Sequence, residues 1–254
     1  MPKKTTTNEP NRTELLEQKT ILEHVGELRK RILQTALAFG AVFVASLAFI
    51  RWLIPIIFNS DSMVLLGPLD VLKIYFSVAA ILAIGFTLPF AAFQLWKYVT
   101  PALTAHERKE TLLIIPWIFI SFAVGIAFGY YVIFPILYQF LMTLAEGQFE
   151  MMITASEYLR FMLISTLPLG FLFELPVVIV FLTSLGLVTP DMLRKKRKYV
   201  YLVLVILSVM ITPPDFISDF IVITSLLALY EAGIWLSGVT FRKRQKAMAA
   251  ASAG

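Results

Sequence analysis

Long apolar runs separated by short polar segments make up most of the chain. Several runs are about 20 residues long, which is the length of helix that crosses about 30 Å of hydrocarbon. The residue-by-residue alternation typical of a membrane β-barrel is absent from the sequence. The pattern predicts an all-α integral membrane protein with six transmembrane helices, at about 32–53, 71–96, 112–134, 158–187, 199–212 and 217–238.

Polar segments at both ends of the chain lie outside these spans. Residues 1–18 are polar, and we expect a disordered tail there. From 19 to 31 apolar residues recur at helical spacing, which predicts an interfacial helix that runs into the first span. We therefore expect a membrane domain over 19–238 and a basic tail over 239–254.

The composition agrees with a membrane protein. Hydrophobic residues make up 58% of the chain, charged residues make up 15%, and the mean hydropathy is +0.79. Soluble domains carry about a quarter charged residues. Because the chain has no cysteine, disulfides and thiolate metal sites are excluded.

The positive charges are distributed unevenly between the polar segments. Nineteen of the 22 Lys and Arg residues fall in the N-terminal tail, in 97–110, in 191–199 and in the C-terminal tail. Arg51, Lys73 and Arg160 fall on the other side of the predicted membrane. Because Lys and Arg accumulate on the cytoplasmic side, both termini are predicted to be cytoplasmic. The excess of positive charge thus reflects membrane topology, and no nucleic-acid partner is expected.

Two features of the spans leave alternatives open. The fifth span, of about 14 residues, would reach about 21 Å, which is less than the hydrocarbon thickness of about 30 Å. Either its helix extends into 191–199, which the charges otherwise predict to be a basic loop, or the bilayer thins beside it. Gly125 and Gly129 in the third span form a small-xxx-small pair, which either marks a helix–helix contact or arises by chance.

A histidine and a carboxylate recur in two polar stretches, as His24 with Glu27 and as His106 with Glu107. Both stretches are predicted to be cytoplasmic, so they could form one site. Two carboxylates there would suit a ligand with adjacent guanidinium groups, because the planar fork of Arg matches a carboxylate in a way that Lys cannot copy. The alternative is an ordinary surface salt bridge between Glu27 and Arg31 at i,i+4.

Glu174 lies near the middle of the fourth predicted span. A charge at this depth costs about 3 kcal/mol or more, so the side chain is expected to face a protein interior or to be protonated. Pro168, Gly170 and Pro176 around it predict an irregular helix. The alternatives for Glu174 are proton or cation transport, partner docking, and a neutral carboxyl bonded to a neighbouring helix.

The last outer turn is flanked by Thr212 and Asp219, which we expect to form a polar patch near the outer interface. The sequence contains no convincing catalytic constellation, metal-ligand cluster, phosphate loop or nucleophile elbow. We therefore expect no enzyme activity, no metal and no cofactor.

Five segments along the chain match, in order, the motifs of one family. They read EHVGELRKR at 23–31, QLW with PAL and HER within 94–108, FELP at 173–176, LRKKR at 193–197 and TPPD at 212–215. In this ordered set the chain resembles TatC, the receptor subunit of the twin-arginine protein translocase.

The resemblance implies six spans in a concave, glove-like arrangement in the inner (cytoplasmic) membrane, with both termini cytoplasmic. It implies that Glu27 and Glu107, with the aromatic ring of Tyr98, bind the twin-arginine motif of signal peptides on folded cargo proteins. The family usually has Phe where this chain has Tyr98. Export in this family is driven by the proton motive force, without nucleotide hydrolysis.

The implied partners are the single-span subunits TatA and TatB, within a complex that holds more than one copy of this chain. Glu174 matches an intramembrane glutamate tied to these partners, and Thr212 and Asp219 are further candidates. At Asp219 the family is expected to have an uncharged polar residue such as Gln. The alternative function is a secondary transporter of a small cation or proton that uses Glu174, although the paired repeats of such proteins are not evident.

Overall fold

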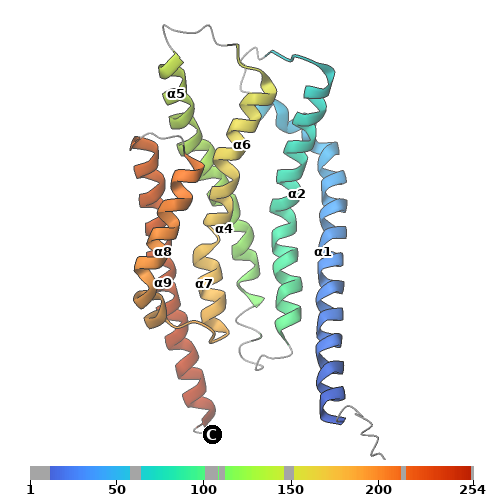
Figure 1. Cartoon of the computed structure of the whole chain (residues 1–254), viewed down its shortest axis with the longest axis vertical. Helices are drawn as coiled ribbons and strands as arrows, with labels where there is room; N and C mark the ends of the chain where they lie inside the picture. The colour runs from blue at the N-terminus through green and yellow to red at the C-terminus, as the bar shows by residue number, and fades with distance from the viewer. Residues whose placement is uncertain are drawn as a thin grey trace, which may run out of the picture.

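The computed structural model describes residues 12–57, 64–100, 108, 112–145, 152–212 and 216–252 of the chain. Within these ranges the long elements are all helices, and they lie side by side in one bundle (Figure 1). The start of α1 and the end of α9 lie at the same end of the bundle, the lower end in Figure 1. The other end contains an isolated bridge between Val64 and Thr154, the residues that precede α2 and α6.

The first two helices pack against each other along one edge of the bundle (Figure 1). Helix α1 runs without interruption over Arg12–Ile57, so the predicted interfacial helix and first span are a single element. Helix α2 covers Pro68–Val99 and begins on a proline, which fits a first turn because the N–H it lacks would have no helical partner there. Residues 1–11 lie outside the described part, and the domain boundaries of the chain stay a prediction.

The third span continues further than the sequence predicted. It consists of α4 (Ile115–Phe128), the π-helical turn η2 (Gly129–Ile133) and α5 (Phe134–Ala145). The prediction that it ends near Pro135 is wrong. The N–H of Phe134 donates to the carbonyl of Gly129, five residues back, and this wider turn leads into the proline, which in a regular helix would clash with the preceding turn.

The fourth span is broken in its middle, as the sequence predicted. Helix α6 covers Ala155–Leu172 and α7 covers Leu175–Ser184, with Glu174 in the short break between them. The side chain of Thr154 caps α6 by accepting a hydrogen bond from the N–H of Glu157 at 3.2 Å.

The basic segment 191–199 is helical, so its description as a loop is wrong. Helix α8 covers Pro190–Ile211, and Thr189 caps it by accepting from the N–H of Met192 at 3.3 Å. Its 22 residues reach about 33 Å, which confirms the alternative in which the fifth helix extends. Helix α9 covers Phe216–Ser252 and continues through the basic C-terminal segment.

Five stretches of the described chain are long and apolar enough to cross a membrane. They lie in α1, in α2, in α4 with α5, in α6 with α7, and in α9. Helix α8 has the length but not the composition, because its first half carries five basic residues, 194–198.

Helices α4 and α6 approach each other backbone to backbone at the glycines singled out in the sequence. A Cβ atom built on Gly125 would lie 2.8 Å from the Cα of Gly170 and 2.8 Å from the carbonyl oxygen of Leu169. One built on Gly129 would lie 2.8 Å from Cγ2 of Thr166. Of the two interpretations of this glycine pair, the helix–helix contact is confirmed.

Candidate functional site

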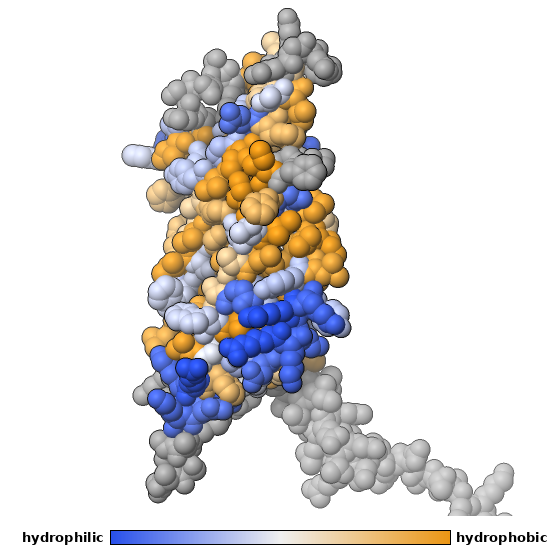
Figure 2. All heavy atoms as spheres, turned by 90° about the vertical axis from the view of Figure 1, so that its left-hand side faces the viewer, coloured by the Kyte–Doolittle hydropathy of each residue, from blue (hydrophilic) through white to orange (hydrophobic). Residues whose placement is uncertain are grey.

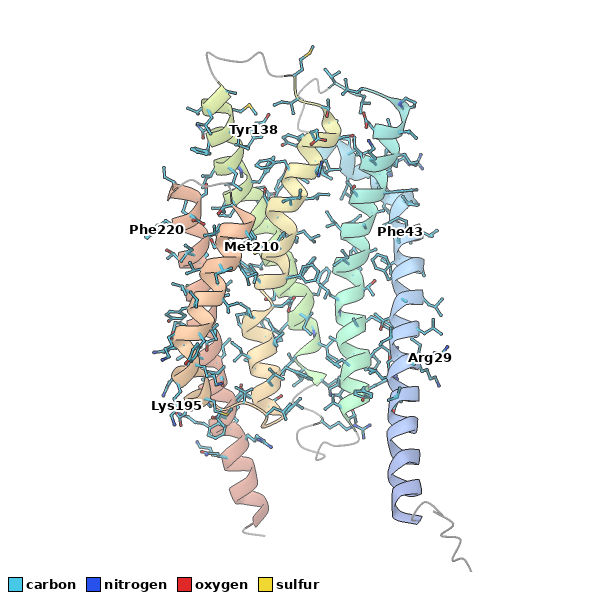
Figure 3. The ribbon with its side chains drawn as sticks, viewed as in Figure 1. Arg29, Phe43, Tyr138, Lys195, Met210 and Phe220 are labelled. Carbon is cyan, nitrogen blue, oxygen red and sulfur yellow. The ribbon has the colours of Figure 1, made fainter. Side chains whose placement is uncertain are left out.

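Basic side chains gather in the lower half of the bundle in the views of Figures 2 and 3. Arg29 of α1 and Lys195 of α8 both project there (Figure 3). On the face formed by α8 and α9, hydrophilic residues cover the lower part, where the basic half of α8 lies (Figure 2). The C-terminal end of α2, which contains Tyr98, points to the same end (Figure 1), so Glu27 and Tyr98 lie toward one end of the molecule.

Glu27 is held by an arginine one turn further along α1. Nη2 of Arg31 donates to Oε1 of Glu27 at 2.9 Å, in the i,i+4 arrangement that the sequence suggested. The salt bridge proposed as the alternative interpretation is therefore present. It uses one carboxylate oxygen of Glu27, and both side chains remain partly open to the surroundings.

The guanidinium of Arg31 also connects α1 with α2. Its Nη1 donates to Oε1 of Gln94 at 3.1 Å, and Nε2 of the buried Gln94 donates to Oε1 of Gln34 at 2.9 Å. Sequence reasoning assigned no functional role to these glutamines. The i,i+4 spacing of Gln94 and Tyr98 is the signal that could have placed Gln94 at the site, because it puts both on one face of α2.

An open cavity of about 540 Å³ lies between α1 and α2, beside this polar network. Arg31, Gln94 and Tyr98 line one part of it. The rest of the wall is largely apolar and consists of Leu28, Ile32, Ala36, Phe39, Ile84, Leu88, Ala91 and Leu95, with Thr35 and Thr87. The structure thus places Tyr98 and Arg31, the partner of Glu27, at the wall of one largely apolar cavity.

The second predicted carboxylate, Glu107, lies outside the described residues, as does His106. The pairing of Glu27 with Glu107 therefore stays a prediction. The next residue, Arg108, is described, and its guanidinium carbon lies 5.8 Å from the centroid of the Trp96 ring. This cation–π contact holds the residue beside Glu107 against the end of α2.

Glu174 faces the protein interior, as predicted from its depth in the span. Its side chain is 8% exposed, and neither carboxylate oxygen has a hydrogen-bond partner among the described residues. The neighbouring carbonyl of Phe173, which the helix break leaves available, accepts a hydrogen bond from Oγ of Ser121 at 2.6 Å. The three roles considered for this carboxyl, which are proton or cation transport, partner docking and a bond to a neighbouring helix, stay predictions.

Thr212 and Asp219 form the polar patch that the sequence predicted. Oδ1 of Asp219 lies 2.8 Å from Oγ1 of Thr212 and 3.2 Å from Oγ of Ser208. Both hydroxyl residues are buried, so this carboxylate oxygen is enclosed where α8 ends and α9 begins. Ser208 is a member of the patch that sequence reasoning missed.

Partly buried side-chain contacts also join the basic half of α8 to α9. Nη2 of Arg197 lies 2.5 Å from Oε2 of Glu231, and Oη of Tyr201 donates to Oε1 of Glu231 at 2.6 Å. Oη of Tyr230 donates to the carbonyl of Leu193 at 3.0 Å. These contacts fix the basic half of α8 against α9 and give both carboxylate oxygens of Glu231 a partner on α8.

Helices long and apolar enough to cross a membrane, with basic side chains gathered toward one end, define a multi-pass membrane protein. The family model described as Sec-independent protein translocase protein (TatC) matches residues 23–224. This chain therefore belongs to the TatC family of protein translocase components, which are non-enzymatic proteins of the inner membrane.

Individual relatives support the same assignment. The chain is 45% identical over 237 residues to the Sec-independent protein translocase protein TatCd of Bacillus subtilis (strain 168). This alignment covers 92% of this chain and 97% of the relative. It is 39% identical over 239 residues to TatCy of the same strain, with coverages of 92% and 94%. A crystal structure of the twin arginine translocase receptor TatC matches with a TM-score of 0.68 at 25% identity, covering 85% of this chain and 99% of that one.

These matches confirm the predicted all-helical TatC-like fold, the inner-membrane location and the protein-transport role. They also support membership of a translocase complex with other Tat subunits. The alternative of a secondary cation transporter is not favoured by any of them.

Proposed function

We propose that this chain is the receptor that binds Arg-Arg signal peptides of folded proteins, at the site formed by Glu27, Tyr98 and Glu107. The observation that carries the proposal is the Glu27–Arg31 pair. Its carboxylate already binds a guanidinium at 2.9 Å, and it does so with one oxygen only. The guanidinium is also the chemical group that distinguishes this class of signal peptide, and this match supports the proposal.

The cavity beside the pair supports the same proposal. A signal peptide carries an apolar segment after its arginines, and the wall of the 540 Å³ cavity is mostly apolar away from Arg31, Gln94 and Tyr98. Charge complementarity at Glu27 and Glu107 would fix the arginines, and the apolar segment would follow α1 and α2 into the membrane. Selection of Arg over Lys follows from the planar donor fork of the guanidinium.

The topology that this function requires has both termini in the cytoplasm. The two described ends of the chain lie at the basic end of the bundle, which the positive-inside rule assigns to the cytoplasm. The signal-peptide site then faces the compartment in which the cargo folds.

The other candidate residues would organise the partner subunits. Glu174 is an unpaired carboxyl in the bilayer region, and Thr212 and Asp219 form a polar patch near the opposite end of the bundle. Single-span TatA and TatB-type subunits with polar side chains would find hydrogen-bond partners at both places. Transport would then draw on the proton motive force, and the complex would hold more than one copy of this chain.

The signal-peptide site can be tested by photocrosslinking in membranes. Glu27→Ala and Glu107→Ala are each expected to lower the yield of crosslinks to an Arg-Arg signal peptide about tenfold, because a hydrogen bond to a charged group contributes about 1.5–3 kcal/mol. A Lys-Lys peptide should crosslink weakly to the unsubstituted protein. Glu157→Ala, at the exposed opposite end of the bundle, is the matched control. Unchanged yields for both Glu27 and Glu107 variants would refute the proposal.

The proposed partner site at Thr212 and Asp219 predicts a loss of partner binding without a loss of signal-peptide binding. Asp219→Ala is expected to reduce crosslinks to a single-span partner about fivefold, since one polar contact contributes about 1 kcal/mol, while signal-peptide crosslinks stay unchanged. Ser225→Ala is the control on the same helix, because Oγ of Ser225 bonds only to the carbonyl of Ile221 in its own helix. Equal losses in the two variants would show that the patch has no special role.

A further inference from the structure

A second cavity lies toward the end of the bundle opposite the basic side chains of α1 and α8. The proposed function does not use it. It lies between the first turns of α2 and α6 and has a volume of about 830 Å³. The segments that lead into the two helices are tied together beside it, because the N–H of Ala155 donates to the carbonyl of Val64 at 3.1 Å. We call it the outer cleft, and it is lined by Leu66, Gly67, Asp70, Lys73, Ile74, Ser77, Thr154, Ser156, Glu157, Leu159, Arg160, Leu163 and Ile164.

Two pairs of opposite charge face this cleft, one from each helix. Nζ of Lys73 lies 3.0 Å from Oδ1 of Asp70, and Nη1 of Arg160 lies 3.9 Å from Oε1 of Glu157. Asp70 is mostly covered, with 14% of its side chain exposed, whereas the side chains of Lys73 and Arg160 are 69% and 72% exposed. The cleft thus offers a recessed carboxylate and two cations that can move toward a ligand.

The cations are exceptional for this end of the molecule. Of the 22 Lys and Arg residues, only Arg51, Lys73 and Arg160 are assigned to this side of the membrane. The positive-inside rule selects against such residues in short outer segments. That two of the three line one cleft is therefore difficult to attribute to the ordinary requirements of topology.

The cleft is also open to the lipid-facing surface. Ile74, Leu159, Leu163 and Ile164 form its apolar part, and the side chain of Ile164 is 54% exposed. These residues lie in candidate membrane spans, within about one helical turn of Lys73 or Arg160. A ligand with a zwitterionic head and apolar chains would satisfy both parts at once, whereas a free anion would use only the cations.

We propose that the outer cleft binds a phospholipid whose headgroup carries both a phosphate and a primary ammonium. The phosphate lies between Lys73 and Arg160, and the ammonium donates to Asp70. One acyl chain follows Leu163 and Ile164 into the bilayer. This site does not depend on signal-peptide binding at the other end of the bundle.

Short-chain lipids test the proposal on the purified full-length protein in delipidated dodecyl maltoside micelles. The probes are dihexanoyl phosphatidylethanolamine, phosphatidylcholine and phosphatidylglycerol, and inorganic phosphate, each titrated by calorimetry. We expect the ethanolamine lipid to bind about tenfold more tightly than the other three, because it alone supplies the phosphate and a compact ammonium donor.

Three variants locate the site. Lys73→Ala combined with Arg160→Ala is expected to weaken binding of the ethanolamine lipid about tenfold, and Asp70→Asn should remove its preference over phosphatidylcholine. Arg51→Ala, which removes the outer cation that does not line the cleft, should leave the affinity unchanged. Unchanged affinity in the double variant would overturn the proposal, and so would equal binding of phosphatidylglycerol or of phosphate alone.

Discussion

Gly125→Leu is expected to lower the free energy of unfolding by about 3 kcal/mol, the upper end of the range for overpacking a well-packed interior. The added side chain would begin with a Cβ atom 2.8 Å from the Cα of Gly170 and from the carbonyl oxygen of Leu169. These are backbone atoms, which cannot move aside as a flexible side chain can. Helices α4 and α6 would have to separate where they cross.

Thermal unfolding of the detergent-solubilised protein would measure this loss as a lowered Tm. Gly40→Leu in α1 is the matched control, because nothing lies within 4 Å of a Cβ built on Gly40. The control should keep the Tm of the unsubstituted protein. If both variants unfolded at the same temperature, the close crossing of α4 and α6 would be disproved.

Lys196→Pro should be nearly as damaging, at about 3 kcal/mol, because a proline inside a helix removes one hydrogen bond and clashes with the preceding turn. Position 196 lies inside the first half of α8, where the sequence alone indicated a loop. A break there would also displace Arg197 and Tyr201, which hold Glu231 of α9. The variant is expected to show a lowered Tm and increased proteolysis between 190 and 200.

Asp191→Pro provides the comparison for this substitution. Residue 191 lies in the first turn of α8, next to Pro190, and the cap of Thr189 bonds to the N–H of Met192 instead. First-turn prolines are tolerated because their missing N–H has no helical partner. A protein that tolerated both prolines equally would have a loop, not a helix, in this segment.

Local patterns predicted those features that depend on residues close in the chain. The Glu27–Arg31 pair follows from i,i+4 spacing, and the break at Glu174 follows from the prolines around it. The buried Thr212–Asp219 contact spans only seven residues across one turn. In each case neighbouring residues determine the geometry, so the sequence carries the information directly.

Some features depend on the average hydropathy of a segment or on contacts between residues far apart in the sequence. These features could not be predicted in this way. A run of five basic residues lowers the local hydropathy so strongly that the first half of α8 resembles a loop, although Thr189 and Pro190 are good helix-start signals. Pro135 indicated a helix end, but the π turn before it lets the helix continue. The bond from Arg31 to Gln94 joins residues 63 positions apart, and the outer cleft joins α2 to α6.

The bond between Arg31 and Glu27 has a consequence for how tightly any guanidinium ligand can be held. A free carboxylate would gain the full energy of a new ion pair, whereas in the signal-peptide site proposed above an incoming arginine would replace or share a contact that already exists at 2.9 Å. Binding is then an exchange between two similar states, and its net free energy is a small difference. Because Nη1 of Arg31 bonds to Gln94 while Nη2 bonds to Glu27, the bond to Gln94 would not have to break in such an exchange. Weak net binding of this kind would let a receptor release each signal peptide after use.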